Sequence, residues 1–381
     1  MSANPDDRLE AVLFDDDDPG RRGEAHGELW RAEIHELAAI RLGLALSKSE
    51  IKDEGEILEL ARRHLPLLDA YHPELAAEFA GIARGADIDP ALLVILNHYT
   101  DLRDIPRSAL GPGVRGATPA EGDDAGCTAV YIPGLTTPTL GQTWDMHRTA
   151  SPYVRLLRVR PKSGDREVLF FTLVGCLAMT GINEHGLGVT INNLVSTDAQ
   201  LGVLWPAVVR AMLDTPTASA AKDRLMATTL SSGHHYMIAD GRDFYGIETS
   251  GQEKVLTQVG ARAAHIHTNH CFDPVLRKVE RVPPTSTTFR RLDLASTLYV
   301  QQRPQTATEL WDFLCSHEGY PKSICTHAPD HPDPHVSETC GRLVMDLGSG
   351  EVLASRGCGQ THPGVAFTLD RWRDKRAADA P

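Results

Sequence analysis

The feature that most constrains this chain is a glycine–cysteine pair at the start of a strand-like run. Gly126 and Cys127 open the run 126–132, in which most residues are apolar or β-branched. A proline–glycine turn signal follows directly, and a second run ends at Trp144 and Asp145. Two such runs on either side of turn residues are typical of paired β-strands. The pattern therefore predicts two strands, the first opening at Cys127 and its partner ending at Asp145.

The order of glycine and cysteine suits a chain that cuts itself between the two residues. Gly126 tolerates backbone geometries that other residues avoid, so the peptide bond after it can distort. The Cys127 thiol can attack that bond from the adjacent side chain. After an acyl shift from nitrogen to sulfur and hydrolysis, Cys127 would be a new N-terminus. Its α-amine, with an ordinary pKa of about 7.7–8, could then serve as the base for its own thiol.

Four motifs that recur in order extend this interpretation to most of residues 20–360. They are DAGCT at 124–128, QTWD at 142–145, GINEHGLGVTINNL at 181–194 and HTNH at 267–270, with a looser fifth, LVMDL, at 343–347. Through them the chain resembles the acyl-coenzyme A:6-aminopenicillanic acid acyltransferase family, the C45 autoproteolytic peptidases. These proteins belong to the N-terminal-nucleophile hydrolases, so the resemblance implies self-cleavage between Gly126 and Cys127.

The resemblance also implies roles for single residues. Cys127 would be the nucleophile, Asp145 would orient the amine of that nucleophile, and Asn269 would donate its side-chain amide to the oxyanion of the tetrahedral intermediate. The alternatives are a small buried hydrophobe for the cysteine, a turn cap for Asp145 and a local turn for Asn269. The position of Cys127 directly after Gly126 favours the catalytic interpretation.

Three further residues are candidates for contact with the substrate. Asn192 and Asn193 end a strand-like run, and related amidases have an asparagine there that faces the active site. Adjacent strand residues face opposite ways, so the choice between the two stays open. Trp144, beside Asp145, is the third candidate. The run 337–343 follows the family pattern only loosely, so no pocket residue is assigned from it.

Hydrophobic periodicity divides the chain into a helical and a strand-rich part. Apolar residues recur every three or four positions within 21–48, which predicts an amphipathic helix. Further helices are predicted at 54–68 and 72–86, and a helix that starts at Asp89 and Pro90. From Cys127 onward, strand pairs are predicted at 153–160 with 168–174, 177–183 with 187–191 and 235–239 with 244–248, and helix pairs at 203–214 with 217–229 and 288–301 with 307–318.

Strands in runs and helices in pairs fit two stacked sheets covered by helices. The expected fold is therefore α+β, the four-layer αββα sandwich of the N-terminal-nucleophile hydrolases. Residues 1–126 would form a helical segment that becomes the small chain after cleavage and stays bound. Residues 127–381 would form the catalytic core. The acidic residues 1–20 are expected to be loosely held, and 105–125 to form a loop.

Bulk properties exclude several classes of protein. The formal net charge of −13 argues against a nucleic-acid-binding surface. No apolar run approaches the ~20 residues of a membrane helix, and the first residues lack the features of a secretory signal. The seven cysteines are irregularly spaced, which indicates reduced thiols rather than a disulfide framework. We therefore expect a cytoplasmic protein, and leave open whether it forms a homo-oligomer.

The 17 histidines raise the question of a metal site. Histidines recur every fourth residue at 327, 331 and 335, but the prolines at 329, 332 and 334 exclude a helix that would align them. His265 and His267 could share a strand face, yet no carboxylate or cysteine is placed to close a site. Phosphate- and dinucleotide-binding glycine motifs are absent. We expect neither a bound metal nor a cofactor.

The expected function is hydrolysis of a small N-acyl amine or peptide-like amide through a thioester acyl-enzyme. The first alternative is acyl transfer to an amine such as a β-lactam nucleus, with a coenzyme A thioester as donor. Hydrolysis comes first because it needs no second binding site. The alternative of another class is a non-enzymatic scaffold or thiol sensor, which would have no need of Gly126, Cys127, Asp145 and Asn269 together.

Overall fold

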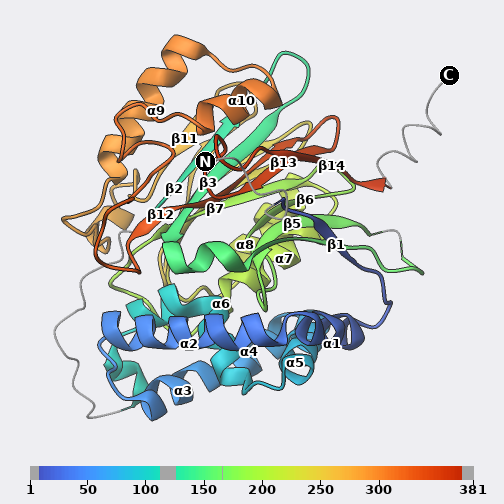
Figure 1. Cartoon of the computed structure of the whole chain (residues 1–381), viewed down its shortest axis with the longest axis vertical. Helices are drawn as coiled ribbons and strands as arrows, with labels where there is room; N and C mark the ends of the chain where they lie inside the picture. The colour runs from blue at the N-terminus through green and yellow to red at the C-terminus, as the bar shows by residue number, and fades with distance from the viewer. Residues whose placement is uncertain (1–7, 112–125, 165, 371–381) are drawn as a thin grey trace.

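The computed structural model describes residues 8–111, 126–164 and 166–370, and two β-sheets form its centre (Figure 1). The eight-stranded sheet contains, in spatial order, β1 (Ala11–Phe14), β4 (Val154–Val159), β5 (Val168–Leu173), β6 (Thr180–Asn183), β7 (Gly188–Leu194), β8 (Gly233–Ala239), β9 (Phe244–Thr249) and β10 (Lys254–Val259). The six-stranded sheet contains β11 (His265–His267), β2 (Gly126–Ile132), β3 (Thr139–His147), β12 (Ser337–Asp346), β13 (Glu351–Arg356) and β14 (Val365–Thr368).

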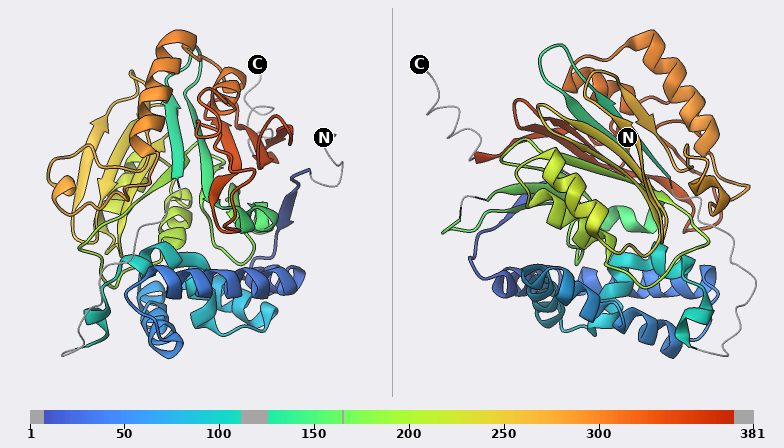
Figure 2. Two further views of the ribbon diagram at one scale, coloured as in Figure 1. Left: turned by 60° about the vertical axis from the view of Figure 1, so that its left-hand side comes forward. Right: turned by 180° about the vertical axis from the view of Figure 1, so that it is seen from behind.

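Helices cover the outer face of each sheet. The helices α7 (Trp205–Leu213) and α8 (Ala218–Ala227) pack on the eight-stranded sheet, whereas α9 (Thr288–Gln302) and α10 (Ala307–Leu314) pack on the six-stranded sheet. The inner faces meet where β2 and β3 contact β7. Figure 2 shows the stacked sheets from two sides. The central strands are buried because they lie between a helix layer and the other sheet, whereas the edge strands β1, β10 and β14 are partly exposed. The expected α+β fold, a four-layer αββα sandwich, is therefore confirmed.

The N-terminal part forms a further helical layer below α7 and α8 in Figure 1. Its helices are α1 (Pro19–Leu29), α2 (Arg31–Lys48), α3 (Glu54–Arg62), α4 (Leu65–Tyr71), α5 (Pro73–Ala86) and α6 (Pro90–Asp104). Asp89 caps α6, since its side chain accepts a hydrogen bond from the Ala91 amide. The single helix predicted over 21–48 is wrong, because the chain leaves helical geometry at Trp30 and starts again as α2. The helix predicted over 54–68 is likewise two helices.

The start of the chain is more ordered than its acidic composition predicts. Residues 1–7 lie outside the described part, but β1 pairs in parallel with β4 along the edge of the eight-stranded sheet. Asp16 forms an ion pair with Arg21, and Asp18 caps α1. The expectation of a loosely held start is therefore wrong for residues 11–18. Of the loop predicted at 105–125, residues 107–110 form a 3-10 helix and 112–125 lie outside the described part.

Buried polar contacts join the helical layer to the sheets. His26 Nε2 accepts a hydrogen bond from the Gly175 amide (2.8 Å), and the Asn97 side chain donates to the Gly175 carbonyl (2.8 Å). Asp101 pairs with His234 on β8 at 3.0 Å. Apolar residues of both parts belong to one continuous core. The first hundred residues are therefore part of the packed molecule and not an appended arm.

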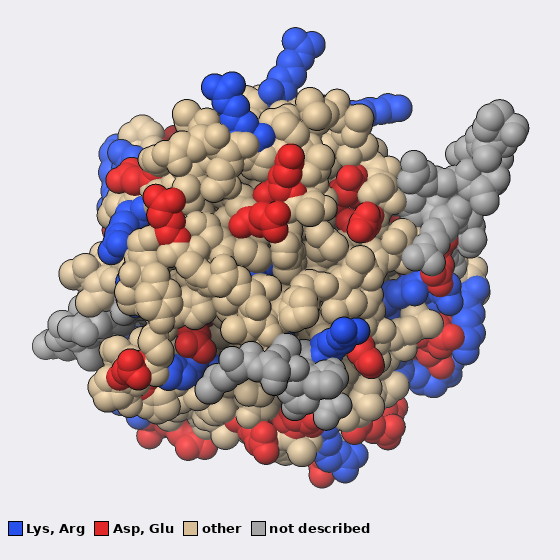
Figure 3. All heavy atoms as spheres, turned by 45° about the horizontal axis from the view of Figure 1, so that its top comes forward, with Lys and Arg blue, Asp and Glu red and all other residues tan. Residues whose placement is uncertain are grey.

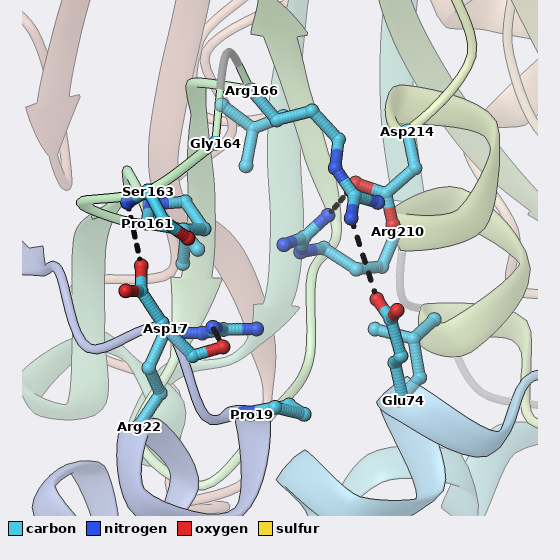
Figure 4. A pocket seen from close by; sticks show the side chains of 13 residues that line it. Asp17, Pro19, Arg22, Glu74, Pro161, Ser163, Gly164, Arg166, Arg210 and Asp214 are labelled. Atoms are coloured by element: carbon cyan, nitrogen blue, oxygen red, sulfur yellow. Dashed lines mark hydrogen bonds and ion pairs between the residues drawn. The ribbon is translucent and has the colours of Figure 1, made fainter.

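A charged cavity of about 130 Å³ lies at another part of this junction (Figure 4). Asp17 accepts a hydrogen bond from the Ser163 amide at 2.8 Å, between the start of the chain and the loop that joins β4 to β5. Glu74 on α5 pairs with Arg166 at 3.5 Å. These contacts again connect the N-terminal part to the strand-rich part.

The surface shows no concentration of positive charge on the face in Figure 3, where the Lys and Arg side chains of the described residues lie scattered among Asp and Glu side chains. Large areas between them carry neither kind of charge. Within the described part of the chain, none of the helices combines the length and the apolar composition needed to span a bilayer.

Candidate active site

Cys127 lies on the second residue of β2, at one end of the six-stranded sheet. β2 and β3 pair in antiparallel register, so that Gly126 lies opposite Asp145 and Cys127 opposite Trp144. The Cys127 side chain is only 6% exposed. The hairpin predicted from the sequence therefore forms, and its register brings three of the candidate residues together. Asp124 and Ala125, which complete the first motif, lie outside the described residues.

Asn269 reaches Cys127 because β11, which precedes it, pairs with β2. Its Oδ1 accepts hydrogen bonds from the Cys127 backbone nitrogen (2.7 Å) and from Arg291 Nη2 (2.8 Å). Its Nδ2 donates to the Asn193 carbonyl at 2.9 Å. Two N–H donors at one atom identify that atom as the oxygen. In this structure Asn269 Nδ2 already donates to Asn193, so the expected donation from Asn269 to an oxyanion stays a prediction.

Arg291, in the first turn of α9, is a site residue that the sequence analysis missed. Its guanidinium is buried and donates from Nη1 to the Cys127 carbonyl (2.8 Å) and to Thr128 Oγ1 (3.1 Å). Burial lowers the pKa of Arg291, while the charge of Asp145 opposes this shift. A methyl group at Gly126 would lie 2.5 Å from Arg291 Nη2, so a residue without a side chain is needed there.

Asp145 is the buried carboxylate of the site. Its Oδ1 accepts a hydrogen bond from Thr339 Oγ1 at 2.7 Å, whereas its Oδ2 is buried and has no hydrogen-bond partner among the described residues. Burial raises the pKa of Asp145 to about 6, against the opposing charge of Arg291 and the bond from Thr339. A break in the β12–β3 register between Thr339 and Gly341 leaves Thr339 opposite Asp145. Thr339 lies in the run 337–343, from which no pocket residue could be assigned.

The Cys127 thiol is protonated at neutral pH in the uncut chain. Burial, and then the charge of Asp145, raise the pKa of Cys127 to about 12. Because the thiolate is the reactive form of a cysteine, attack by this thiol requires a group that takes its proton. The site holds one carboxylate with a free buried oxygen, Oδ2 of Asp145, and one buried cation, Arg291.

Asn192 and Asn193 both contact the site, from opposite faces of β7. Asn192 is fully buried between the sheets, where its Nδ2 donates to the Cys127 carbonyl at 3.1 Å and its Oδ1 contacts His235 Nδ1 at 3.1 Å. Asn193 is partly exposed and lines a pocket next to Cys127. The alternation of strand residues therefore gives them different environments, one structural and one accessible.

The pocket beside Cys127 has a volume of about 40 Å³ and a largely apolar wall. The apolar part of that wall consists of Trp144, Met146, Met179, Ile191 and Trp205. Thr100, from α6, lines the pocket as well. The N-terminal helical layer therefore contributes directly to the site. The small apolar pocket suits a short apolar group of a substrate.

The histidines of the HTNH motif have structural contacts. His267 Nε2 pairs with Glu248 Oε1 at 2.9 Å, and its ring stacks on His235 at a centroid distance of 3.6 Å. Glu248 also accepts hydrogen bonds from the Phe272 and Asp273 amides. This buried network fixes the chain on both sides of Asn269.

Two stacked sheets with helices on both outer faces form the αββα arrangement of the N-terminal-nucleophile hydrolases. A model of the family described as acyl-coenzyme A:6-aminopenicillanic acid acyl-transferase matches residues 135–335, more than half of the 381 residues. The chain therefore belongs to this family of enzymes. A protein of Emericella nidulans, described as the 40 kDa form of acyl-coenzyme A:6-aminopenicillanic-acid-acyltransferase, is 24% identical over 313 residues, which are 81% of this chain and 82% of that protein.

Two solved structures show a lower similarity. Penicillin V acylase from Agrobacterium tumefaciens shares 13% identity with a TM-score of 0.39, and the alignment covers 64% of this chain and 86% of that one. A variant of the conjugated bile acid hydrolase from Clostridium perfringens shares 12% identity with a TM-score of 0.44 over 64% and 93%. The assignment to the family rests on the family match and not on these likenesses.

Proposed function

We propose that this protein is a cysteine amidohydrolase that activates itself by cutting the bond between Gly126 and Cys127. One observation carries the proposal: side chains from three other parts of the chain, two of them buried, form hydrogen bonds with both backbone groups of Cys127. Asn269 accepts from its nitrogen, and Arg291 and Asn192 donate to its carbonyl oxygen. A cysteine that served only to fill the core would not need side-chain hydrogen bonds to both of its backbone groups.

The cut would proceed through an ester-like intermediate on sulfur. The Cys127 sulfur adds to the Gly126 carbonyl carbon, and Asp145 Oδ2 takes the thiol proton. The bond between that carbon and the Cys127 nitrogen then breaks, and the proton passes to this nitrogen, which becomes an amine. Water hydrolyses the resulting thioester, giving the Gly126 carboxylate and a free thiol. Asn269 supports this sequence because it holds the nitrogen that becomes the leaving group.

In the cut enzyme the new α-amine of Cys127 would replace Asp145 as the base for the thiol. Asn269 Oδ1 and Asp145 are the acceptors available to orient that amine. The thiolate would attack the carbonyl of a substrate amide, expel the amine and form a thioester. Water would then release the acyl group as a carboxylate. The apolar pocket beside Cys127 suits the acyl part of a small N-acyl amine or peptide-like amide.

Acyl transfer is the second candidate, because the relative in Emericella nidulans is named as a transferase that uses acyl-coenzyme A. An amine in place of water would then resolve the thioester, and coenzyme A would enter as part of the acyl donor. Hydrolysis comes first, since the pocket of about 40 Å³ offers one small site and transfer needs room for a second substrate.

The two pieces of the cut chain would stay together. Residues 1–126 would be the small chain and 127–381 the catalytic core. Asn97 and Asp101 of α6 form buried hydrogen bonds across the junction, and Thr100 lines the pocket. Loss of the small piece would therefore expose part of the core to solvent and remove one wall of the pocket.

Intact mass of the purified protein tests the proposal directly. The wild type is expected to give two masses, split before Cys127, whereas Cys127→Ala gives a single uncut chain. Cys176→Ala, which removes a cysteine buried elsewhere in the core, is the matched control and should cut normally. A wild type that stays uncut after long incubation would rule out self-cleavage and favour a scaffold or thiol sensor.

A further inference from the structure

Two histidines and two cysteines converge at a place that the proposed reaction does not use. The four residues are His317, Cys325, His327 and Cys358. Each contributes one nitrogen or sulfur atom, and these four atoms lie within 4.8 Å of one another. The two Nε2 atoms are 2.8 Å apart, Cys325 Sγ lies 3.5 Å from His327 Nε2, and Cys358 Sγ lies 3.3 Å from His317 Nε2. We call these four residues the Cys/His cluster.

We propose that the Cys/His cluster is a structural zinc site. Zinc prefers four ligands in a tetrahedron, with bonds of about 2.3 Å to sulfur and about 2.0–2.1 Å to nitrogen. Such a tetrahedron has edges of about 3.3–3.8 Å. The separations between the four ligand atoms fit this arrangement with small adjustments. Two thiolates and two imidazoles are also the ligand set that selects zinc over harder metal ions.

The surroundings of the cluster support thiolates at this point. Arg342, which is buried on β12, donates from Nη2 to Cys325 Sγ at 3.1 Å and from Nη1 to Cys315 Sγ at 2.8 Å. A cation that donates to a ligand sulfur is a typical partner of a metal-bound thiolate. Cys315 lies outside the cluster, so Arg342 donates to one ligand thiol and to one neighbouring thiol.

The irregular backbone around the cluster would be stabilised by a bound metal ion. Residues 315–336 contain neither helix nor strand and carry three of the four ligands. A segment of this length without regular structure is uncommon inside a packed domain. Cys358 comes from a different segment, the turn after β13, where Gly357 has a left-handed conformation (φ +62°). A bound zinc ion would therefore tie a long irregular segment to the six-stranded sheet.

The charges balance when zinc binds. Zinc(II) displaces one proton from the thiol of Cys325 and one from that of Cys358, and these two protons pass to solvent. The two imidazoles bind through Nε2 in their neutral form. The resulting group of one zinc ion and two thiolates carries no net charge, which suits a site where both cysteines are buried.

The cluster connects to the candidate active site through one residue. Thr326 lies between the ligands Cys325 and His327, and its amide donates to Thr339 Oγ1 at 2.9 Å. The Thr339 amide donates in return to the Thr326 carbonyl at 3.0 Å. Thr339 is the residue that donates to Asp145. The zinc ion would thus hold the segment against which Thr339 and Asp145 are positioned.

Metal analysis of the untagged full-length protein tests this proposal without reference to activity. We expect one zinc ion per chain in the wild type and in Cys127→Ala, since the site does not depend on the proposed reaction. Cys358→Ser and His317→Ala should lose the zinc, whereas Cys315→Ser, which removes the neighbouring thiol, should keep it. The chelated wild type should unfold at a lower temperature than the zinc-bound protein.

Cobalt substitution provides a measurement that needs no variant. Cobalt(II) added to the reduced, chelated wild type should give the absorption of a tetrahedral ion with thiolate-to-metal charge-transfer bands. A wild type that binds neither zinc nor cobalt in a one-to-one ratio would overturn the proposal. So would equal zinc in the wild type and Cys358→Ser, or a disulfide between Cys325 and Cys358 in protein purified under reducing conditions.

Discussion

Cys127 and the Cys/His cluster show two ways in which this molecule buries a cysteine sulfur. At Cys127 the backbone is held by three side chains while the sulfur itself faces a pocket. In the cluster the side-chain atoms converge on one another instead. A thiol next to a pocket and acid–base groups is arranged for attack, whereas a thiol closed in by three other ligands is arranged for coordination. The groups around a buried cysteine, and not its burial, therefore decide what the cysteine does.

The two regions differ in charge as well as in geometry. The Cys127 site contains one buried carboxylate and one buried guanidinium, Asp145 and Arg291, and its chemistry depends on both. The cluster would be neutral once zinc is bound. Removal of the Arg291 charge should therefore affect cleavage and leave the zinc in place.

The largest effect is expected for Arg291→Gln. The change removes the donor to the Cys127 carbonyl and the buried positive charge near Asp145, so the attacking cysteine is misplaced and cleavage should slow by more than about 10²-fold. Loss of the buried guanidinium leaves the Cys127 carbonyl and Asn269 Oδ1 without a donor, which should also lower the free energy of unfolding by roughly 1–3 kcal/mol. Mass spectrometry and denaturant unfolding measure the two effects. Arg290→Gln, at the exposed neighbouring position, is the control.

Zinc content separates the two regions in the same variant. Arg291→Gln should contain as much zinc as the wild type, because Arg291 lies on α9 and has no contact with the cluster among its described hydrogen bonds. Loss of zinc together with cleavage would contradict the separation between the two regions.

Gly126→Ala should have the next largest effect. The added methyl group would lie 2.5 Å from Arg291 Nη2, so the guanidinium must move away from the Cys127 carbonyl. Displacement of the reacting groups by about 1 Å can slow a reaction by about 10²-fold. A time course of cleavage by mass spectrometry checks this. Gly43→Ala, where the new methyl group meets no atom within 4 Å, should cut at the wild-type rate.

The pH dependence of cleavage should reveal Asp145. Because the pKa of Asp145 is raised to about 6, the carboxylate that takes the thiol proton is lost as the pH falls below 6, and the rate should drop about tenfold per pH unit. The slow variant Gly126→Ala allows this measurement. A raised pKa in the folded state means that protonation of Asp145 stabilises the folded chain, so its titration does not unfold the protein. A rate independent of pH between 5 and 7 would exclude Asp145 as the acceptor.

The smallest effect is expected for Thr339→Val, at the link between the two regions. The hydrogen bond from Thr339 lowers the pKa of Asp145, so its removal should raise that pKa and move the loss of cleavage to higher pH. At pH 7 the rate should fall by ~3–10-fold. Thr190→Val, which removes a buried hydroxyl that has no hydrogen-bond partner in the described part, is the control. An unchanged pH profile would show that Thr339 does not set the pKa of Asp145.

Much of the fold could be predicted, because its elements follow simple periodicities. Turn residues join β2 to β3, and Asp89 with Pro90 marks the start of α6. Short edge strands were missed: β1 has four residues beside an acidic run, and β14 likewise has four. Their pairing comes from neighbouring strands and not from their own composition.

The site was predicted only where a residue has a distinctive neighbour in the sequence. Cys127 follows a glycine, and Asn269 lies between histidines, so both stand out. Arg291 follows another arginine in an ordinary helical pattern, and only the fold shows which of the two is buried. The cluster was missed for a similar reason. Metal-binding histidines are recognisable in a sequence when their spacing aligns them on one helix, whereas His327 meets a cysteine that lies 31 positions further along the chain.

The parallel pairing of β1 with β4 has a consequence for how such an enzyme is made. If the chain cuts itself before Cys127, the small piece keeps an edge strand in a sheet built by the large piece. Synthesis as one polypeptide then ensures equal numbers of both pieces. It also lets that strand pair with the sheet before any bond is cut. A gene that encoded the two pieces separately would have to recover this pairing by collision, so in a self-cleaving protein the uncut precursor would act as the assembly template of the two-chain enzyme.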